Sequence, residues 1–349
     1  MTKIAVLAGD GIGPEIINGA IIILNKVIAK FGLNLEFSEG LFGGCGYDAQ
    51  GQPFPDSTKK LVAECDAVFL GAVGGPQWDN IERKMRPEAA LLELRKTLGL
   101  YCNLRPVKYY PALKNKVVWK EGYLEGVDIV VLRELTGGAY FGEKGRTRQG
   151  AFDTITYTQE EISRIVKEGF EIANKRKKIL HSVDKANVLE TSRLWREIVN
   201  ETAQSYPQVK VKHLYVDNAA LQLVINPGQF DVIVTENMFG DILSDQAASI
   251  AGSLGMLPSA SLGGKINLYE PSHGSAPDIA GQNKANPVAT ILSAAMLLRF
   301  TCGHEKGAAA IEQAVEKTMA EGYRTIDIAD KDSKVVGTKE MAELIAKEI

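Results

Sequence analysis

The chain has 349 residues and a mass of 37.9 kDa, which exceeds the commonest domain size of roughly 100 to 150 residues, so we expect two domains. A hydrophobic fraction of 45% and a charged fraction of 24% exclude a collagen-like, fibrous or disordered chain. Forty Lys and Arg residues against 43 Asp and Glu residues give a net charge of -3, so no global positive field would attract nucleic acid or an anionic membrane.

Export and membrane insertion are not predicted. The apolar run Ile4 to Ala8 is shorter than a signal core of roughly 7 to 15 residues, and the stretch Pro287 to Leu298 is too short to span a bilayer. The four cysteines lie far apart without a Cys-x-x-Cys motif. This pattern predicts free thiols in the cytoplasm rather than a disulfide framework or a zinc site.

The order of the predicted elements indicates an α/β fold. The chain begins with a strand, Lys3 to Leu7, a glycine turn, and a helix from Pro14 to about Phe31. Further buried strands are predicted by apolar, β-branched runs at residues 66–72, 127–132 and 231–235. Further helices are predicted by helical spacing at residues 56–63, 87–98, 239–251 and from 287 onward. Strands that alternate with helices are typical of α/β proteins.

Two segments break this alternation. Residues 140–157 are polar and Gly-rich and then alternate, which predicts a protruding hairpin, an arm suited to pairing with a second subunit. Residues 252–281 are rich in glycine and proline, so we expect a long irregular segment, which in a compact domain is usually functional.

The glycine turn matches a dinucleotide-binding fingerprint only in part. In Gly9-Asp10-Gly11-Ile12-Gly13-Pro14, the last glycine of G-x-G-x-x-G is replaced by Pro14 or Ile16, depending on the register. A tight strand-to-helix turn is the favoured explanation of the glycines.

A pair of aspartates indicates a metal site or a solvated helix face. Asp241 and Asp245 are four residues apart, so they share a face on which two like charges repel unless a cation lies between them. Asp217 could supply a third oxygen ligand for Mg²⁺ or Mn²⁺. Such a pair by itself is more often a solvated face, so both interpretations stay open.

Other polar residues are candidates for binding an anion and moving protons. One helical stripe carries Glu88, Leu91, Leu92 and Arg95, which would line either a pocket for a half-apolar anion or an amphipathic core contact. Arg105 and Arg133 follow strand-like segments and suit carboxylates, although surface ion pairs would also explain them. Lys185 is a candidate proton acceptor, although a lysine exposed on the surface is the alternative interpretation. Tyr140 is a candidate proton donor, and the alternative is an aromatic ring that only packs.

Taken together, these motifs resemble the β-decarboxylating dehydrogenases, the family of the isocitrate and isopropylmalate dehydrogenases. The similarity runs from Gly9 to the C-terminal helices and is strongest at residues 237–245 and 270–281. It implies an isopropylmalate dehydrogenase-like fold, in which two α/β domains share a mixed central sheet, rather than a Rossmann fold. The first domain would comprise residues 1–101 and 253–349. The second, 102–252, would carry the metal site, the dimerisation surface and the arm at about 140–157.

The resemblance moves the nucleotide-binding loop to residues 270–286. The residues expected to bind the cofactor are Glu270, His273, Gly274, Ser275, Ala276, Pro277, Asp278, Ile279 and Asn286. An acid at the position of Asp278 holds the adenosine ribose in members that use NAD, and its charge would repel the 2′-phosphate of NADP.

The resemblance also assigns the substrate and the metal. Arg95, Arg105 and Arg133 would grip the substrate carboxylates, and Asp241 and Asp245 would bind one Mg²⁺ or Mn²⁺ per site. Asp217, as metal ligand and substrate contact, and Lys185 would enter from the partner subunit of a homodimer with shared active sites. A dianionic substrate, three Asp and three Arg leave two negative charges, which one divalent ion neutralises.

The expected reaction is the NAD-dependent oxidative decarboxylation of (2R,3S)-3-isopropylmalate to 2-oxoisocaproate and CO₂ in leucine biosynthesis. Lys185 would take the hydroxyl proton as hydride passes to NAD⁺, and Tyr140 would protonate the enol carbon after CO₂ loss.

Substrate choice within the family would rest on the Glu88 helix. Burial of an isopropyl group against Leu91 and Leu92 is worth about 1.5 to 3 kcal/mol, and Glu88 would repel the third carboxylate of isocitrate. Two alternatives stay open: a related enzyme for tartrate, D-malate or homoisocitrate, and a two-domain solute-binding protein for a dicarboxylate.

Overall fold

The chain divides into two compact units in a computed structural model that describes residues 1–120 and 122–349. Unit 1 comprises Met1–Gly99, Tyr110–Val118 and Ala251–Ile349, and unit 2 comprises Leu100–Tyr109 and Trp119–Ile250. Unit 1 therefore contains both termini of this sequence, and unit 2 is formed by its middle. The boundaries of the functional domains, residues 1–101 with 253–349 and residues 102–252, stay a prediction.

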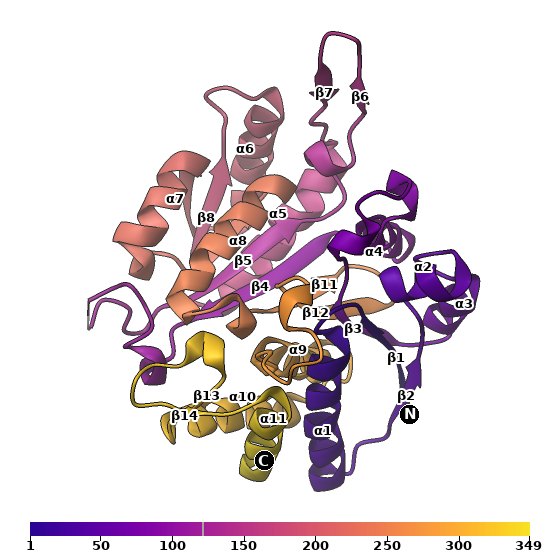
Figure 1. Ribbon diagram of the computed structural model, residues 1–349. Helices are drawn as coiled ribbons and strands as arrows, with labels where there is room; N and C mark the ends of the chain where they lie inside the picture. Colours follow the sequence, from indigo (N-terminus) through magenta and orange to yellow (C-terminus); the bar gives the residue numbers. More distant parts are fainter. Residues whose placement is uncertain (121) are drawn as a thin grey trace. The chain divides into compact units, whose positions relative to one another are not determined.

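The sheet of unit 1 is mixed (Figure 1). Its strands, in spatial order, are β2 (Leu35–Glu39), β1 (Thr2–Gly9), β3 (Ala67–Ala72), β12 (Asn267–Pro271) and β11 (Pro258–Leu262). Neighbours are parallel except for β12 and β11, which are antiparallel. The predicted strands at 3–7 and 66–72 are confirmed.

The prediction that residues 252–281 are irregular throughout is wrong. The segment contains the short helix η6 (Leu254–Met256) and then β11 and β12, which pair with Pro258 opposite Pro271. The two prolines stand at the ends of the pair, where a missing N–H disturbs the ladder least. Composition hid these strands because their pairing and the burial of Leu268 and Tyr269 are tertiary effects.

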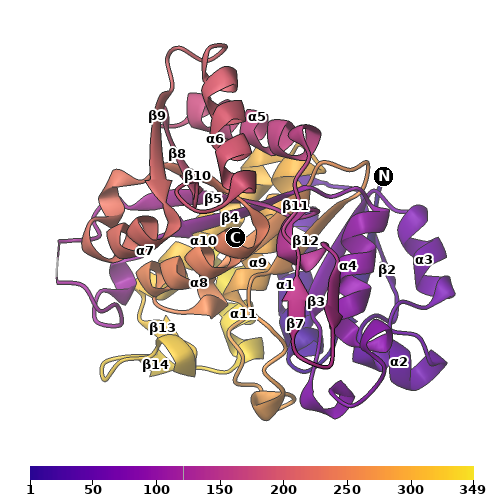
Figure 2. The same cartoon turned by 90° about the horizontal axis from the view of Figure 1, so that it is seen from above.

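Helices surround the sheet of unit 1. The longer helices are α1 (Gly13–Phe31), α2 (Gly44–Gln50), α3 (Asp56–Ala63), α4 (Pro87–Thr97), α9 (Val288–Phe300), α10 (Glu305–Ala320) and α11 (Thr338–Glu348). Shorter elements are η1 (Pro76–Trp78), η2 (Arg83–Met85), η3 (Pro111–Leu113), η7 (Pro277–Ile279), η8 (Ile326–Ile328), β13 (Tyr323–Arg324) and β14 (Lys334–Val335). Residues 288–298 of α9 are all buried, since α9 packs on β11, α10 and α1, while α11 covers α1 (Figure 2). A helix that is apolar on every side is stable only in such a core.

The strands of unit 2 are also parallel and antiparallel. Its strands, in spatial order, are β4 (Cys102–Lys108), β5 (Asp128–Glu134), β10 (Val232–Thr235), β8 (Ile179–Asp184) and β9 (Lys210–Tyr215). β4 is antiparallel to β5, and the remaining neighbours are parallel. Its helices are α5 (Gln159–Lys175), α6 (Glu190–Ala203), α7 (Val216–Ile225), α8 (Asn237–Ala251), η4 (Gly138–Tyr140) and η5 (Pro227–Gln229). An antiparallel pair among the strands of each unit confirms a mixed α/β fold rather than a Rossmann fold.

The predicted hairpin is present. β6 (Lys144–Arg146) and β7 (Ala151–Asp153) pair antiparallel and project away from the other elements of unit 2 in Figure 1. The strand ends at Asp153, so the alternation up to Tyr157 does not continue the hairpin. Use of the arm by a second subunit stays a prediction.

The glycine turn after β1 is explained by close packing. Gly9 has a φ of 75°, and a Cβ at this position would lie 2.0 Å from the carbonyl oxygen of Ala72. The buried carboxylate of Asp10 accepts hydrogen bonds from the backbone N–H groups of Gly44, Cys45 and Gly74, each at 2.8 Å. These contacts give the turn a structural role in unit 1.

The steric role of Gly9 predicts a large cost for Gly9→Ala. We expect the free energy of unfolding to fall by about 3 kcal/mol or more, because a left-handed backbone and a clash with Ala72 add together. Gly32→Ala is the matched control, since Gly32 has a φ of 67° but no atom within 4 Å of an added Cβ, and it should cost about 1 kcal/mol. Urea unfolding measures both; equal losses would contradict the proposed clash.

His181 in β8 predicts a pH dependence of stability. It is fully buried against Phe230, neither ring nitrogen has a partner among the described residues, and burial lowers its pKa to about 4. Below pH 6.5 the unfolded state therefore binds a proton that the folded state excludes, and stability falls as the pH approaches 4. From pH 7 to pH 4.5, wild type should lose about 2 to 3 kcal/mol more unfolding free energy than His181→Phe. Parallel losses in urea titrations would contradict this assignment.

Candidate functional site

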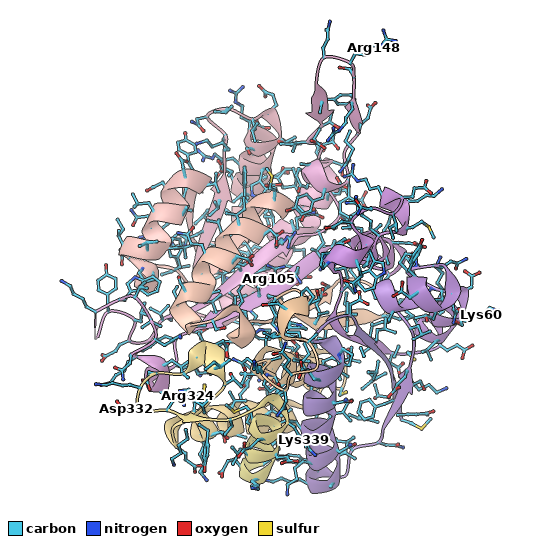
Figure 3. The ribbon with its side chains drawn as sticks, viewed as in Figure 1. Lys60, Arg105, Arg148, Arg324, Asp332 and Lys339 are labelled. Carbon is cyan, nitrogen blue, oxygen red and sulfur yellow. The ribbon has the colours of Figure 1, made fainter. Side chains whose placement is uncertain are left out.

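Two buried arginines lie side by side on the sheet of unit 2. Arg105 on β4 and Arg133 on β5 are 5% and 3% exposed, and Asn103 stands opposite Arg133 in the strand register. The Nε atom of Arg105 donates to the side-chain oxygen of Asn103 at 2.6 Å. Alternation along the strands puts all three side chains on one face of the sheet. Figure 3 labels Arg105 on this sheet.

Helix α8 brings the predicted aspartates to these arginines. Asp241 forms an ion pair and hydrogen bond with Nη1 of Arg133, and its Oδ1 atom lies 3.3 Å from Nη1 of Arg105. Asp245 lies 3.6 Å from the same Arg105 nitrogen. The structure therefore brings together Arg105, Arg133, Asp241 and Asp245. The interpretation of the pair as a plain solvated face does not hold for Asp241.

Further residues of α8 hold the arginines in place. Asn237 accepts from Nε and Nη2 of Arg133 at 3.1 and 2.9 Å, and Ser244 accepts from Nη1 of Arg105 at 2.7 Å. A Cβ at Gly240 would lie 2.7 Å from the Arg133 side chain. Asn237, Gly240 and Ser244 were missed from the sequence, although their spacing of three and four residues places them with Asp241 on one helix face.

Tyr140 joins the same cluster from the end of η4. Its hydroxyl donates to Oδ2 of Asp241 at 2.9 Å, and the guanidinium of Arg133 lies 5.6 Å from its ring centroid. Burial, and then the charge of Asp241, raise the pKa of Tyr140. The phenol is therefore protonated near neutral pH and can act as a proton donor.

Lys185 and Asp217 form a pair of their own. Nζ of Lys185, after β8, lies 2.9 Å from Oδ1 of Asp217 in the first turn of α7, and this hydrogen bond lowers the pKa of Asp217. Within residues 1–120 and 122–349, no three His, Cys, Asp or Glu side chains are grouped to hold a metal. Asp217 therefore does not join Asp241 and Asp245 within one chain.

The donor set on α8 fits part of a divalent metal site. Asp241 and Asp245 present carboxylate oxygens one helical turn apart, and the Asp245 side chain is 54% exposed. Burial raises the pKa of Asp245, while Arg105 lowers it and Asp241 raises it further. Oxygen donors of this kind suit Mg²⁺ or Mn²⁺, although among the described residues no third His, Cys, Asp or Glu side chain joins them.

In unit 1, two predicted site residues bind each other. Nη2 of Arg95 on α4 lies 2.7 Å from Oε1 of Glu270 at the end of β12, and both residues are buried. The resemblance assigns Arg95 to the substrate and Glu270 to the cofactor, whereas the structure joins the two residues to each other. On the same helix, Leu91 and Leu92 are half-buried and Glu88 is exposed.

The loop after β12 is fastened to the glycine turn. Ser275 donates from its hydroxyl to the carbonyl of Gly74 at 2.7 Å, and its own carbonyl accepts the N–H of Ile12 at 2.8 Å. A Cβ at Gly11 would lie 2.0 Å from that Ser275 carbonyl oxygen, and Ala276 adopts a φ of 37°. The glycine turn therefore supports this loop.

The other loop residues differ in exposure. Gly274, Pro277 and Asp278 are exposed, whereas Ile279 packs with Ala276 against a small core that contains Ile12. Asn286 and His273, in contrast, make polar contacts.

Asn286 is buried at the end of the loop, where its side-chain oxygen accepts the N–H of Val288 at 3.0 Å and its amide donates to Asp327 at 3.1 Å. His273 contacts the carbonyl of Gly274 at 2.9 Å, and burial lowers its pKa. Asn286 is therefore fixed by the fold, whereas Asp278 is accessible to a ligand.

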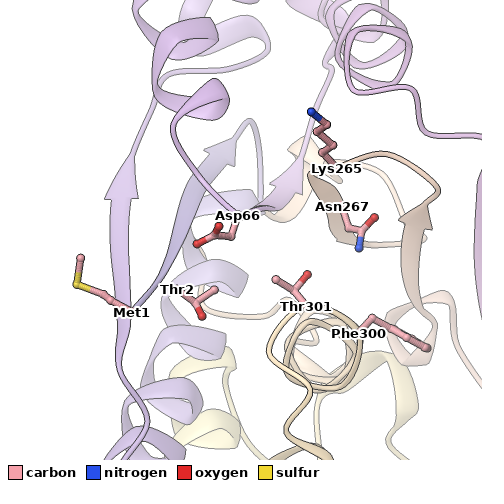
Figure 4. A pocket seen from close by; sticks show the side chains of 7 residues that line it. All are labelled: Met1, Thr2, Asp66, Lys265, Asn267, Phe300 and Thr301. Atoms are coloured by element: carbon pink, nitrogen blue, oxygen red, sulfur yellow. The ribbon is translucent and has the colours of Figure 1, made fainter.

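A separate cavity of unit 1 contains none of these residues. It measures about 380 Å³ and is lined by Met1, Thr2, Asp66, Lys265, Asn267, Phe300 and Thr301 (Figure 4). It lies where β1 and β12 begin, and none of the predicted site residues lines it. None of the helices in the described part of the chain combines the length and apolar character needed to cross a membrane.

Comparison with known proteins identifies the family. The model of the isocitrate/isopropylmalate dehydrogenases matches residues 3–345. A 3-isopropylmalate dehydrogenase of Desulfitobacterium hafniense is 58% identical over 348 residues, covering 99% of both chains. One of Carboxydothermus hydrogenoformans is 55% identical over 353 residues, covering 99% of this chain and 94% of the relative.

Solved structures agree with this match. An isocitrate dehydrogenase from Methylococcus capsulatus has a TM-score of 0.90 at 33% identity, covering 100% of this chain and 99% of its own. A β-decarboxylating dehydrogenase from Thermococcus kodakarensis has a TM-score of 0.82 at 36% identity, covering 100% and 96%. The resemblance inferred from the motifs is confirmed: the chain belongs to the isocitrate/isopropylmalate dehydrogenase family, a family of oxidoreductases.

Proposed function

We propose that this protein catalyses the NAD-dependent oxidative decarboxylation of (2R,3S)-3-isopropylmalate to 2-oxoisocaproate and CO₂ in leucine biosynthesis. Relatives named 3-isopropylmalate dehydrogenase are 53–58% identical over nearly the whole chain. The observation that carries the proposal is the cluster of Arg105, Arg133, Asp241 and Tyr140 in unit 2, which joins two cations, a carboxylate and a protonated phenol.

The arginines are assigned to the substrate carboxylates. Arg105 and Arg133 are buried and held rigid by neutral partners and Asp241, so their orientation is set before a ligand arrives. A preorganised guanidinium can donate two parallel hydrogen bonds to a carboxylate. Arg95 of unit 1 is assigned the same role, and its Nε atom has no partner within the described residues.

Asp241 and Asp245 are assigned to one Mg²⁺ or Mn²⁺, together with the partner subunit's Asp217. When bound, the ion would acidify the substrate hydroxyl and stabilise negative charge on its oxygen. The exposed Asp217 and its neighbour Lys185 project from the same protomer as a pair, which agrees with their use by a second copy.

Proton transfer is assigned to two residues. In its neutral form, the partner subunit's Lys185 would take the hydroxyl proton as hydride passes to NAD⁺, and Tyr140 would return a proton to the carbon that has lost CO₂. The hydrogen bond of Tyr140 to Asp241 orients its hydroxyl, and its raised pKa keeps the proton available.

The surface of unit 2 supports the proposal of a homodimer, in addition to this assignment. α7 and α8 expose four large apolar side chains, Leu221, Val224, Ile225 and Ile242. Exposed apolar side chains that gather on neighbouring elements are typical of a protein interface.

The four cysteines are free thiols, which supports a location in the reducing cytoplasm.

Cofactor and substrate selectivity are assigned to unit 1. The loop residues Glu270, His273, Gly274, Ser275, Ala276, Pro277, Asp278, Ile279 and Asn286 would bind NAD. Asp278 is exposed, so its carboxylate can accept from the adenosine ribose. Leu91 and Leu92 would contact the isopropyl group, and Glu88 would repel a further carboxylate.

A substrate panel tests the proposal. With NAD⁺ and Mg²⁺, kcat/KM for 3-isopropylmalate should exceed that for D-malate about 10- to 200-fold, because D-malate lacks the branched group. Isocitrate and tartrate should be poorer still. NADH absorbance measures each rate. Faster reduction with D-malate or tartrate would favour a related enzyme, and binding of 3-isopropylmalate without reduction would favour a solute-binding protein.

The metal assignment predicts a specific effect of Asp245→Asn. We expect the Mg²⁺ concentration for half-maximal activity to rise about tenfold or more, because one anionic ligand is lost, while the Kd for NAD⁺ changes less than about twofold. Asp332→Asn changes an exposed aspartate of unit 1 outside the proposed site and serves as the control. A Mg²⁺ titration of Asp245→Asn that overlays those of wild type and the control would refute the assignment.

A further inference from the structure

We propose that Tyr157 is a positioning residue for this reaction, because its hydroxyl and ring join the turn that carries Tyr140 to the first turn of α8, which carries Asp241. The inference rests on the proposed function, in which Tyr140 donates a proton. All the contacts that support it lie within unit 2.

The hydroxyl of Tyr157 caps α8. It accepts the backbone N–H of Asn237, the first residue of the helix, at 3.0 Å, and donates to Oε2 of Glu236 at 3.2 Å. Oε1 of Glu236 accepts the N–H of Phe239 at 2.7 Å. N–H groups in the first turn of a helix lack partners within the helix, so Tyr157 and Glu236 together satisfy two of them.

The ring of Tyr157 packs directly beneath the Tyr140 turn. A Cβ at Gly137 would lie 2.3 Å from Cε1 of Tyr157, and a Cβ at Gly138 would lie 2.6 Å from its hydroxyl oxygen. The N–H of Gly138 also donates to the carbonyl of Thr156 at 3.0 Å. Two successive glycines therefore let the backbone of this turn approach the ring and the chain beside it.

Asn237 also links the turn that carries Tyr140 to Arg133. Its side-chain amide donates to the carbonyl of Gly137 at 3.2 Å, while its side-chain oxygen accepts from Arg133. The turn, the start of α8 and a substrate-binding arginine thus meet at residues that Tyr157 contacts. A shift of the Tyr157 hydroxyl would therefore displace the turn that carries Tyr140 from the start of α8.

Tyr157 itself is well anchored. Its ring meets the buried Trp195 edge-on, with 6.1 Å between ring centroids, and the next residue, Thr158, caps α5 by a capping box with Glu161. Burial raises the pKa of Tyr157, and the nearby Glu236 raises it further, so the hydroxyl keeps the proton that it donates. The contact is therefore present throughout the neutral pH range.

Tyr157→Phe isolates the role of the hydroxyl, because the ring stays. We expect kcat with saturating 3-isopropylmalate, NAD⁺ and Mg²⁺ to fall about tenfold, with KM for NAD⁺ unchanged. In a Tyr140→Phe background the same change should lower kcat less than about twofold, since a residue that acts through Tyr140 loses its effect when Tyr140 no longer donates.

Hydrogen–deuterium exchange of the ligand-free protein supplies a readout independent of activity. Amides in residues 136–141 and 236–241 should exchange at least about fivefold faster in Tyr157→Phe than in wild type, because the first turn of α8 loses a cap. Tyr206→Phe is the matched control, since it removes another Tyr–Glu hydrogen bond of unit 2, from Tyr206 to Glu171 at 3.0 Å. It should change neither kcat nor exchange in these segments.

Wild-type kcat and exchange in Tyr157→Phe would overturn the proposal. So would an equal loss of kcat in both backgrounds, because that result would assign Tyr157 an effect independent of Tyr140. A wild-type protein that does not oxidise 3-isopropylmalate would instead refute the proposed function. The exchange data would then still decide whether Tyr157 joins the turn to α8.

Discussion

The placement of one carboxylate beside two buried guanidinium groups is the interaction on which the candidate site of unit 2 depends. Arg105 and Arg133 are almost wholly buried, and unpaired charge in such a position is costly. Asp241 contacts both, and Asp245 lies farther from Arg105. The same cost explains why the arginines are also surrounded by neutral hydrogen-bond acceptors.

Those neutral partners fix the orientation of the two guanidinium groups and do not compensate their charge. Asn103, Asn237 and Ser244 accept from the arginines, and Gly240 lets α8 approach the Arg133 side chain. Unit 1 uses a related arrangement, in which Glu270 holds Arg95 by a buried ion pair. In both units a charged side chain suited to a ligand is thus oriented by the protein before any ligand binds, which lowers the cost of binding.

Local patterns predicted elements well where the signal lies within a few residues. The helices at 13–31 and 237–251 and the strands at 67–72 and 232–235 occur within about three residues of their predicted limits, because periodicity and end signals are local. The prediction failed at β11 and β12, where glycine, serine and proline conceal two strands. Neither strand has a strong local preference, and each is stabilised by pairing with the other and by α9.

The sequence by itself determined the fold class, the family, and the helix face shared by Asp241 and Asp245, since spacing and motif are properties of the linear chain. Only the tertiary structure decided that Arg95 pairs with Glu270, that Asp217 pairs with Lys185 rather than with the α8 aspartates, and that Tyr157 caps α8. Each of these contacts joins residues that are far apart in the sequence, and the shortest separation is the 32 positions between Lys185 and Asp217. Burial and hydrogen-bond partners depend on such distant neighbours, and no local pattern specifies them.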